Sequence, residues 1–477
     1  MKARHLLAIA TLVLHAAFQL HAADKPKAFR AGAAASNITP PLGGGIVGNW
    51  RSPAATHVND ELHARCLVLD DGGTRIGFVI VDSVGVTRPV FDHAKRVLKK
   101  ETGLPPENLL MAATHTHSSV SARGSDRFDY NPVLDEYQSF LVSRIVDGVK
   151  RAINNLEPAR IGWGGGDEPR HVSNRRWHMK AGFNLSNPFG GQDKVRMNPP
   201  RGKMLDRPAG PTDPEVSIVS VQAKDGRPIA LLANYSLHYV GGVPKGHLSA
   251  DYFGMFADRI QQLLGADRKS PPFVGIMSNG TSADINNIDF TGTRPRRQPY
   301  EQIRIVANDV ADAAFKAVKE IKHKDWVPLG AAAKELKLLV RRPSQPLVDR
   351  ANRILASPKA KDPNTTDKEV IYAKRTLKLA KFEPSTEVFI QALRIGDLGI
   401  ASMPFEVFAE IGLDIKEHSP FQDSFTIELA NGTFGYLPTP EQHRLGGYET
   451  WLGTCWVEIQ ASEKITRTVL DLFQELK

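Results

Sequence analysis

Two histidines stand one residue apart in the segment "MAATHTHSSV", residues 111–120. Neutral imidazole is a preferred ligand of zinc, and a His-x-His pair is a common opening of zinc hydrolase sites. The apolar run before the pair predicts a strand, and side chains two residues apart leave a strand on the same face. The sequence therefore predicts that His115 and His117 reach one cavity, where both, one or neither holds a metal ion.

Two familiar metal patterns do not account for this pair. The binuclear metallo-β-lactamase pattern requires Asp-His two residues further on, where this chain has Ser119 and Val120. The amidohydrolase-barrel pattern places its pair near the start of the chain and fits poorly. The partners of the two histidines must therefore be sought in later segments.

Apolar runs with strand and helix periods alternate along the chain and separate polar loops. They predict an α/β fold with a mixed β-sheet core and flanking helices. The expected strands cover residues 64–71, 75–83, 108–118, 160–166, 215–223, 228–238, 271–280, 387–396, 398–404 and 425–430. The expected helices cover 89–103, 135–154, 300–322 and 349–381, and others begin near Asp251, after Phe405 and after Ser462.

The N-terminal segment differs from the rest of the chain. Lys2 and Arg4 precede the apolar stretch "LLAIATLVL", and small residues around Ala22 and Ala23 follow it. This order predicts a signal peptide over residues 1–23 and a secreted or periplasmic protein. We expect residues 24–477 to form one catalytic domain, with residues 341–381 as a basic helical insertion.

The net charge of +9 would suit anionic partners, but lysine and arginine are spread along the chain. We expect no nucleic-acid partner and at most peripheral contact with anionic membranes. Cys66 and Cys455 are the only cysteines, so they can pair after export or remain two separate thiols. The oligomeric state is left open.

Several polar segments follow apolar strands, which is where open α/β sheets place ligands. They read "THTHSS", "YSLHYV", "SNGTSADINN", "MPFEVF" and "ANGTFGYLPTPEQHRLGGYET". Together with "AGAAASNITPPLGG", "VIVDSVGV", "SNRRW" and "LSADYFG", and in this order, they resemble the catalytic N-terminal domain of the neutral ceramidases. The resemblance covers nearly the whole expected domain.

This resemblance implies one zinc ion held by His115, His238, Glu406 and Tyr436. Independently of the resemblance, two histidines and a carboxylate are a ligand set of catalytic zinc sites, because three ligands leave a coordination position for water. Each residue has a simpler interpretation as well. His238 could be a core histidine, and Tyr436 could be an ordinary core residue. Glu406 could stabilise the start of the following helix through its negative charge.

The resemblance also assigns residues around the zinc. His117 would lie beside the attacking water and take part in proton transfer, while Arg175 and Tyr448 would polarise the scissile carbonyl. Arg176 adjoins Arg175, so the choice between the two arginines is open. Asp251 would orient His238 or cap the helix that begins there.

One loop departs from the family pattern. The ceramidases read Asn-x-Gly-Asp-Val-Ser-Pro-Asn, with the serine proposed to act near the zinc, whereas this chain reads "NGTSADIN". Asp284 then stands at the serine position and Ser282 at the aspartate position. Asp284 could act as a general base, or it could brace the loop through neighbouring amides.

A second departure is that the chain ends soon after the last motif, where neutral ceramidases continue into an immunoglobulin-like domain. The leading hypothesis is an exported zinc-dependent hydrolase of an amide bond in a ceramide-like or N-acyl substrate. A zinc hydrolase of a non-lipid ester, carbohydrate or peptide derivative is the second hypothesis. A non-catalytic binding protein on the same scaffold is the third.

Overall fold

The computed structural model describes residues 28–48, 50–124, 128, 132–293, 295–362 and 365–477. The signal peptide expected over residues 1–23 lies outside these ranges, so it stays a prediction. Among the described helices, none is both long and apolar enough to span a membrane.

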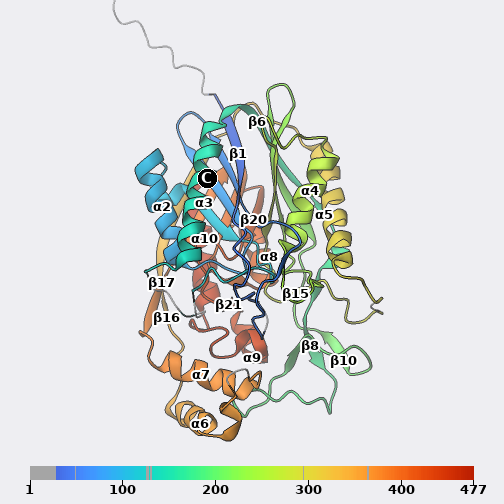
Figure 1. Ribbon diagram of the computed structural model, residues 1–477, viewed down its shortest axis with the longest axis vertical. Coiled ribbons are helices and arrows are strands. Elements are labelled where there is room, and N and C mark those ends of the chain that lie inside the picture. Colours follow the sequence, from blue (N-terminus) through green and yellow to red (C-terminus); the bar gives the residue numbers. More distant parts are fainter. Residues whose placement is uncertain (1–27, 49, 125–127, 129–131, 294, 363–364) are drawn as a thin grey trace, which may run out of the picture.

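An eight-stranded mixed sheet forms the larger part of the core, as the sequence predicted (Figure 1). Its β4–β5 and β12–β14 pairs are parallel, and its other pairs are antiparallel. In spatial order its strands are β14 (Val274–Asn279), β12 (Pro228–Tyr235), β11 (Glu215–Ala223), β6 (Glu157–Asp167), β1 (Arg30–Asn37), β3 (His63–Asp70), β4 (Arg75–Val81) and β5 (Leu109–Ala113).

A second sheet has four strands and packs against the first. Its order is β16 (Leu329–Leu339), β17 (Ser385–Ile395), β18 (Leu398–Ser402) and β20 (Asp423–Ile427). One apolar cluster contains alternate residues of both sheets, among them Leu67, Leu69, Leu393 and Ile395. The next residues along β3, such as Cys66 and Val68, belong to a different cluster on the opposite face. Most strands of the two sheets are therefore buried on both faces, which explains their nearly continuous apolar runs, whereas the edge strand β16 is only partly buried.

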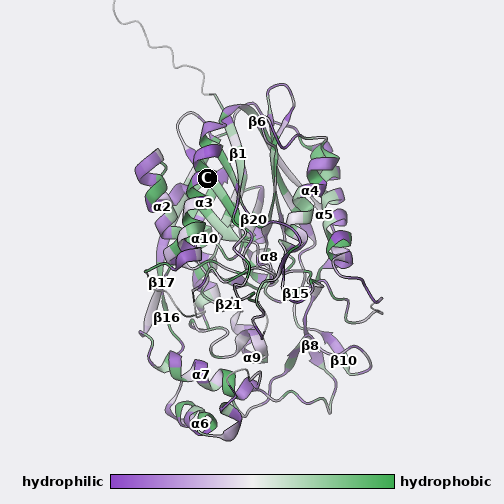
Figure 2. Cartoon of the chain, in the orientation of Figure 1, coloured by the Kyte–Doolittle hydropathy of each residue, from purple (hydrophilic) through white to green (hydrophobic). Residues whose placement is uncertain are grey.

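Helices cover the outer faces of the two sheets. In Figure 2 the strands at the centre of the fold are largely green or pale, whereas the helices also carry purple residues. The first sheet is covered by α2 (Arg88–Thr102), α3 (Glu136–Asn154), α4 (Asp251–Leu263) and α5 (Glu301–Glu320). The second sheet is covered by α8 (Ala409–His418) and α10 (Ala461–Leu476).

Short elements connect the loops at one end of the sheets. Three small sheets pair β2 (His57–Val58) with β13 (His247–Leu248), β7 (Ser173–Asn174) with β15 (Ile285–Asn286), and β19 (Glu406–Val407) with β21 (Tyr436–Leu437). A further sheet has the order β10 (Leu205–Pro208), β8 (Arg176–Met179) and β9 (Val195–Met197). The remaining helices are α6 (Gln345–Leu355), α7 (Lys368–Ala380) and α9 (Pro440–Leu445).

The structure differs from the expected elements at several points. The strand expected over 108–118 ends at Ala113, and the helical stretch expected over 349–381 is two helices, α6 and α7. No strand was predicted at β1 or β16, because β1 is rich in alanine and β16 contains lysine and glutamate, so neither segment is a continuous apolar run. The division into one domain with an insertion stays a prediction.

Candidate functional site

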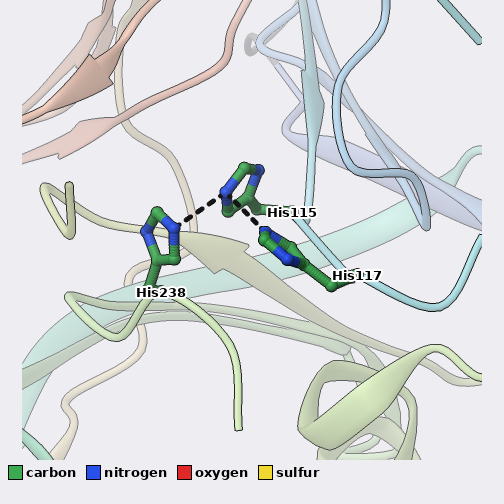
Figure 3. A group of neighbouring side chains, drawn as sticks. All are labelled: His115, His117 and His238. Atoms are coloured by element: carbon green, nitrogen blue, oxygen red, sulfur yellow. Dashed lines mark hydrogen bonds between the residues drawn. The ribbon is translucent and has the colours of Figure 1, made fainter. Parts of the chain in front are cut away.

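Three histidines from two distant segments converge at the end of the larger sheet (Figure 3). His115 and His117 follow β5, and His238 follows β12. The Nε2 atom of His115 lies 3.0 Å from Nε2 of His238 and 3.1 Å from Nε2 of His117. The ligand atoms of all three residues lie within 4.8 Å of one another, so they form a possible metal-binding group.

The reason why His115 and His117 meet differs from the predicted one. The segment is no longer a strand at His115, whose φ is 75°, so the two-residue period of a pleat does not apply there. The backbone amides of Thr114 and His115 instead bond to the carbonyls of Val81, the last residue of β4, and of Ser83 just beyond it. A turn, rather than a strand face, aims both rings into the cavity.

A backbone contact fixes which nitrogen of His115 is free. Its Nδ1 lies 2.6 Å from the carbonyl oxygen of Val84, which can only accept a hydrogen bond. The proton therefore sits on Nδ1 and the lone pair on Nε2, which is the arrangement of a metal-ligating histidine. Burial lowers the pKa of His115 and, strongly, those of His117 and His238, so all three rings are neutral at pH 7.

Glu406 completes a triangle of ligand atoms with two of these histidines. Its Oε2 lies 3.5 Å from Nε2 of His115 and 3.7 Å from Nε2 of His238. Oε2 is buried and has no hydrogen-bond partner. Bonds of about 2.0–2.2 Å around a tetrahedral zinc separate ligand atoms by roughly 3.3–3.6 Å. The three atoms therefore fit a zinc ion, which would also satisfy the orphaned oxygen.

Tyr436 is held next to Glu406 by the backbone. The two residues are paired in the parallel ladder of β19 and β21. The hydroxyl oxygen of Tyr436 accepts a hydrogen bond of 3.1 Å from Nη2 of Arg175. Burial first, and then Glu406, raise the pKa of Tyr436 well above its usual value. The structure thus brings together all four residues of the predicted ligand set.

A second group of metal-ligand types lies elsewhere, at Glu168, His171 and Asp309. Nε2 of His171 lies 2.8 Å from Asp309, and the guanidinium of Arg170 contacts both carboxylates. A protein cation already lies between the carboxylates, so this cluster is complete as an ion-pair network.

The structure distinguishes Arg175 from Arg176. Arg175 lines the cavity that contains the histidines, whereas Arg176 is fully buried behind it and bonds to Gln442. Glu449 holds both, with Oε1 accepting from Nε of Arg175 at 2.9 Å and Oε2 accepting from Nη1 of Arg176 at 2.7 Å. Arg175 is therefore the arginine that can reach a ligand.

The cavity around these groups has a volume of about 630 Å³. Tyr448 lines it, with Trp50 packed edge-on at 6.0 Å between ring centroids. Tyr239 stacks on His117 at 3.7 Å and fixes the orientation of that ring. Arg375 lines the cavity from α7, so the segment expected to be a basic insertion forms part of its wall.

Asp284 and Ser282 are absent from the described lining of this cavity. The Asp284 carboxylate accepts hydrogen bonds from the backbone amide of Ala409 at 2.9 Å and from the side chain of Asn174 at 2.7 Å. Its own carbonyl accepts from the amide of Arg175 at 2.7 Å. Through these contacts Asp284 links the segment of Arg175 to the start of α8. Burial raises the pKa of Asp284 to about 6.

Ser282 donates its hydroxyl to Oε1 of the buried Glu428 at 2.7 Å. Glu428 Oε2 also accepts from the amide of Val407, next to Glu406, at 2.6 Å. Burial raises the pKa of Glu428 well above its usual value. Ser282 thus helps to hold the backbone of the Glu406 segment through Glu428.

The Asp251 carboxylate contacts the loop after His238 and the start of α4. It accepts from the amides of Val240, Gly241 and Tyr252. Burial raises the pKa of Asp251 to about 6.

Cys66 and Cys455 are both buried and unpaired with each other, which answers the question the sequence left open.

Sequence reasoning missed Glu449, Glu428 and Tyr239. Glu449 adjoins Tyr448, and Tyr239 adjoins His238, so each lies inside a segment already quoted for its chemistry. Glu428 is an acid directly after the apolar strand β20, which is an unusual position for a solvated side chain. Its position after the strand could therefore have indicated from the sequence that Glu428 is buried.

No family model matches the sequence. Among solved structures, the chain is similar to the neutral ceramidase from Pseudomonas aeruginosa, with 18% sequence identity and a TM-score of 0.71 over 95% of this chain and 75% of that one. A ceramidase complexed with C2 gives 16% identity and a TM-score of 0.70 over 94% and 75%. At this level of identity the likeness concerns the fold, and the chain therefore has a distant neutral-ceramidase-like fold.

Proposed function

We propose that this protein is a zinc-dependent hydrolase of amide bonds. The observation that carries the proposal is the triangle of Nε2 of His115, Nε2 of His238 and Oε2 of Glu406, with sides of 3.0, 3.5 and 3.7 Å. In this proposal the same three residues and Tyr436 hold the zinc. When bound, zinc lowers the pKa of water from 15.7 to about 7 and polarises a carbonyl group.

His117 is the proposed proton acceptor. Its ring is neutral at pH 7 because burial lowers its pKa, and its stacking on Tyr239 fixes its orientation. Its Nε2 faces Nε2 of His115, so it points toward the site where the attacking water would lie. His117 takes the proton of that water and then passes it to the leaving amine, as a general base followed by a general acid.

Arg175 and Tyr448 are the proposed stabilisers of the negative charge that develops on the carbonyl oxygen. Both line the cavity. Nε of Arg175 is held by Glu449 and Nη2 by Tyr436, so the guanidinium is fixed before substrate binds. Such preorganised donors contribute about 10²–10³-fold to the rate of acyl transfer. Asp284 is assigned to bracing the loop, since its carboxylate bonds Ala409 and Asn174.

A ceramide-like or N-acyl amide is the proposed substrate class, because the structural neighbours are named as ceramidases. A non-lipid ester, carbohydrate or peptide derivative is the second candidate. It is favoured by the polar side chains that line the cavity, namely Ser52, Ser121, Arg123, Asn198 and Arg375. Turnover of soluble amides or esters together with failure on every lipid amide would decide for the second candidate.

Metal content and amide hydrolysis of the purified protein test the proposal in two matched variants. Glu406→Gln should lose zinc and activity together, because it removes a charged ligand. His117→Ala should keep zinc and lose about 10²–10⁴-fold in kcat, the usual contribution of general acid–base catalysis. The opposite result, with zinc lost in His117→Ala and kept in Glu406→Gln, would replace the proposed ligand set by the three histidines.

We also propose that the protein is exported, on the strength of residues 1–23 alone. Mass spectrometry of the mature protein from a culture should find a new N-terminus near Ala22 or Ala23. An intact Met1 in the accumulated protein would contradict export by this route.

A further inference from the structure

A small side pocket opens beside the cavity and is built around two cations. Its lining includes Arg196, Lys368, Asp193, Trp451 and, shared with the main cavity, Met197 and Tyr448. Its volume of about 30 Å³ leaves room for roughly two water molecules. Arg196 lies on β9, and Lys368 is the first residue of α7 in the basic insertion.

Neither cation is neutralised by a described acid. Nε of Arg196 is buried without a hydrogen-bond partner. Lys368 is half-buried, and its pKa is lowered by burial and by the charge of Arg196. Two like charges that share one small pocket destabilise each other, so the folded protein bears a cost here that an anion would remove.

The nearby acids are committed to other groups. The two oxygens of Asp193 accept from the side chains of Asn187 at 3.1 Å and of Trp451 at 2.8 Å. Glu369, the neighbour of Lys368, binds Arg350 and Lys359. Asp193 keeps its negative charge, because both of these partners are neutral, so Arg196, Lys368 and Asp193 together leave the pocket lining with a net charge of +1 for a ligand.

Aromatic contacts explain only part of the position of Lys368. Its Nζ lies 5.7 Å from the ring centres of both Trp50 and Trp451. Such cation–π contacts attract the ammonium group to the rings but supply no hydrogen-bond acceptor oxygen. They hold the ammonium in place beside Arg196, and they do not offset the repulsion between the two cations.

We propose that the substrate carries an anionic oxygen group, such as a carboxylate, sulfonate or phosphate, and that Arg196 and Lys368 bind it in this side pocket. This inference rests on the proposed function of the adjoining cavity. Because Tyr448 borders both spaces, the anionic group lies close to the scissile amide. The substrate class is therefore an N-acyl amide with a short anionic amine part, or an acyl part charged near the carbonyl.

Binding to the zinc-free protein tests this inference without relying on catalysis. The probes are N-lauroyltaurine and the neutral N-lauroylethanolamine, compared by calorimetry at one ionic strength. The wild-type protein should bind the anionic compound at least tenfold more tightly, and Lys368→Met and Arg196→Met should each lose most of that preference. Lys374→Met, an exposed lysine on the same helix, should keep it.

Equal affinity for the two probes, including no binding of either, would overturn the inference, as would a preference unchanged in both variants. N-lauroylglycine and N-lauroylphosphoethanolamine then rank carboxylate and phosphate against sulfonate. With zinc restored, the kcat/KM values of the same compounds should follow the same order. Anion-selective binding without any amide hydrolysis would reject the proposed function and leave the side pocket established.

Discussion

Glu449 shows how one buried acid can organise a site from behind it. It is fully buried, and its two oxygens each bind one arginine, Arg175 in the cavity wall and Arg176 behind it. A carboxylate shared by two guanidinium groups fixes both in direction, because each N–H donor has one acceptor position. The orientation of Arg175 toward the cavity is thus set by a residue that does not line it.

We expect Glu449→Gln to destabilise the protein by about 3–5 kcal/mol, because a buried cation is left without its charge partner. Urea unfolding at pH 7 measures the change. Glu441→Gln is the matched control, since Glu441 is exposed and its ion pair among the described residues is with the exposed Arg444. The control should change stability by less than about 0.5 kcal/mol. Equal values for the two variants would show that Glu449 does not act as this charge partner.

At the scale of elements, a buried lysine joins α2 to the second sheet. Nζ of Lys95 donates to Oδ1 of Asn431 at 2.7 Å. Asn431 in turn donates to Gln391 of β17 at 2.8 Å and to Ser402 of β18 at 3.2 Å. Burial lowers the pKa of Lys95 to about 7. The neutral amine is thus the form that the fold favours.

The pH dependence of stability follows from this shift. Between about pH 7 and pH 10.5 the unfolded chain binds a proton at Lys95 that the folded chain does not, so this residue makes stability rise with pH. From pH 7 to pH 9 wild type should gain about 2–3 kcal/mol relative to Lys95→Met. Denaturant unfolding at both pH values measures it. Lys99→Met replaces an exposed lysine on the same helix, so its free energy of unfolding should depend on pH as that of wild type does. If the free energy of unfolding of Lys95→Met changed with pH in parallel with wild type, the lowered pKa of Lys95 would be contradicted.

At the scale of the whole molecule, the candidate zinc ligands come from both sheets. His115 and His238 follow strands of the larger sheet, while Glu406 and Tyr436 lie in segments that follow strands of the smaller one. An ion held by all four would link the two layers. Metal binding should therefore be visible in global stability as well as in activity.

Zinc at 100 times its dissociation constant should stabilise the folded protein by about 2.7 kcal/mol. Calorimetry should show a higher Tm with zinc and a return to the starting value with excess chelator. His238→Ala should show no zinc-dependent shift. An equal shift in this variant would place the stabilising metal elsewhere, with the cluster of Glu168, His171 and Asp309 as the first place to look.

Much of the architecture followed from local patterns. The strands that later proved buried on both faces are apolar runs, so their existence was readable, while β1 and β16 lack that run and were missed. The polar segments after the strands indicated which residue types the site could contain. Local patterns could not show that His115 leaves the strand at a φ of 75°, because its backbone amide bonds to Ser83, 32 residues away.

The sequence by itself determined the α/β class and the set of residue types offered at the strand ends, because apolar period and loop composition are local properties. Only the tertiary structure decided which atoms meet. It turned Arg175 into the cavity and Arg176 behind it, and it directed the Asp284 carboxylate to Ala409 and Asn174. Those outcomes depend on hydrogen-bond partners more than a hundred residues away, which no local pattern of a single chain encodes.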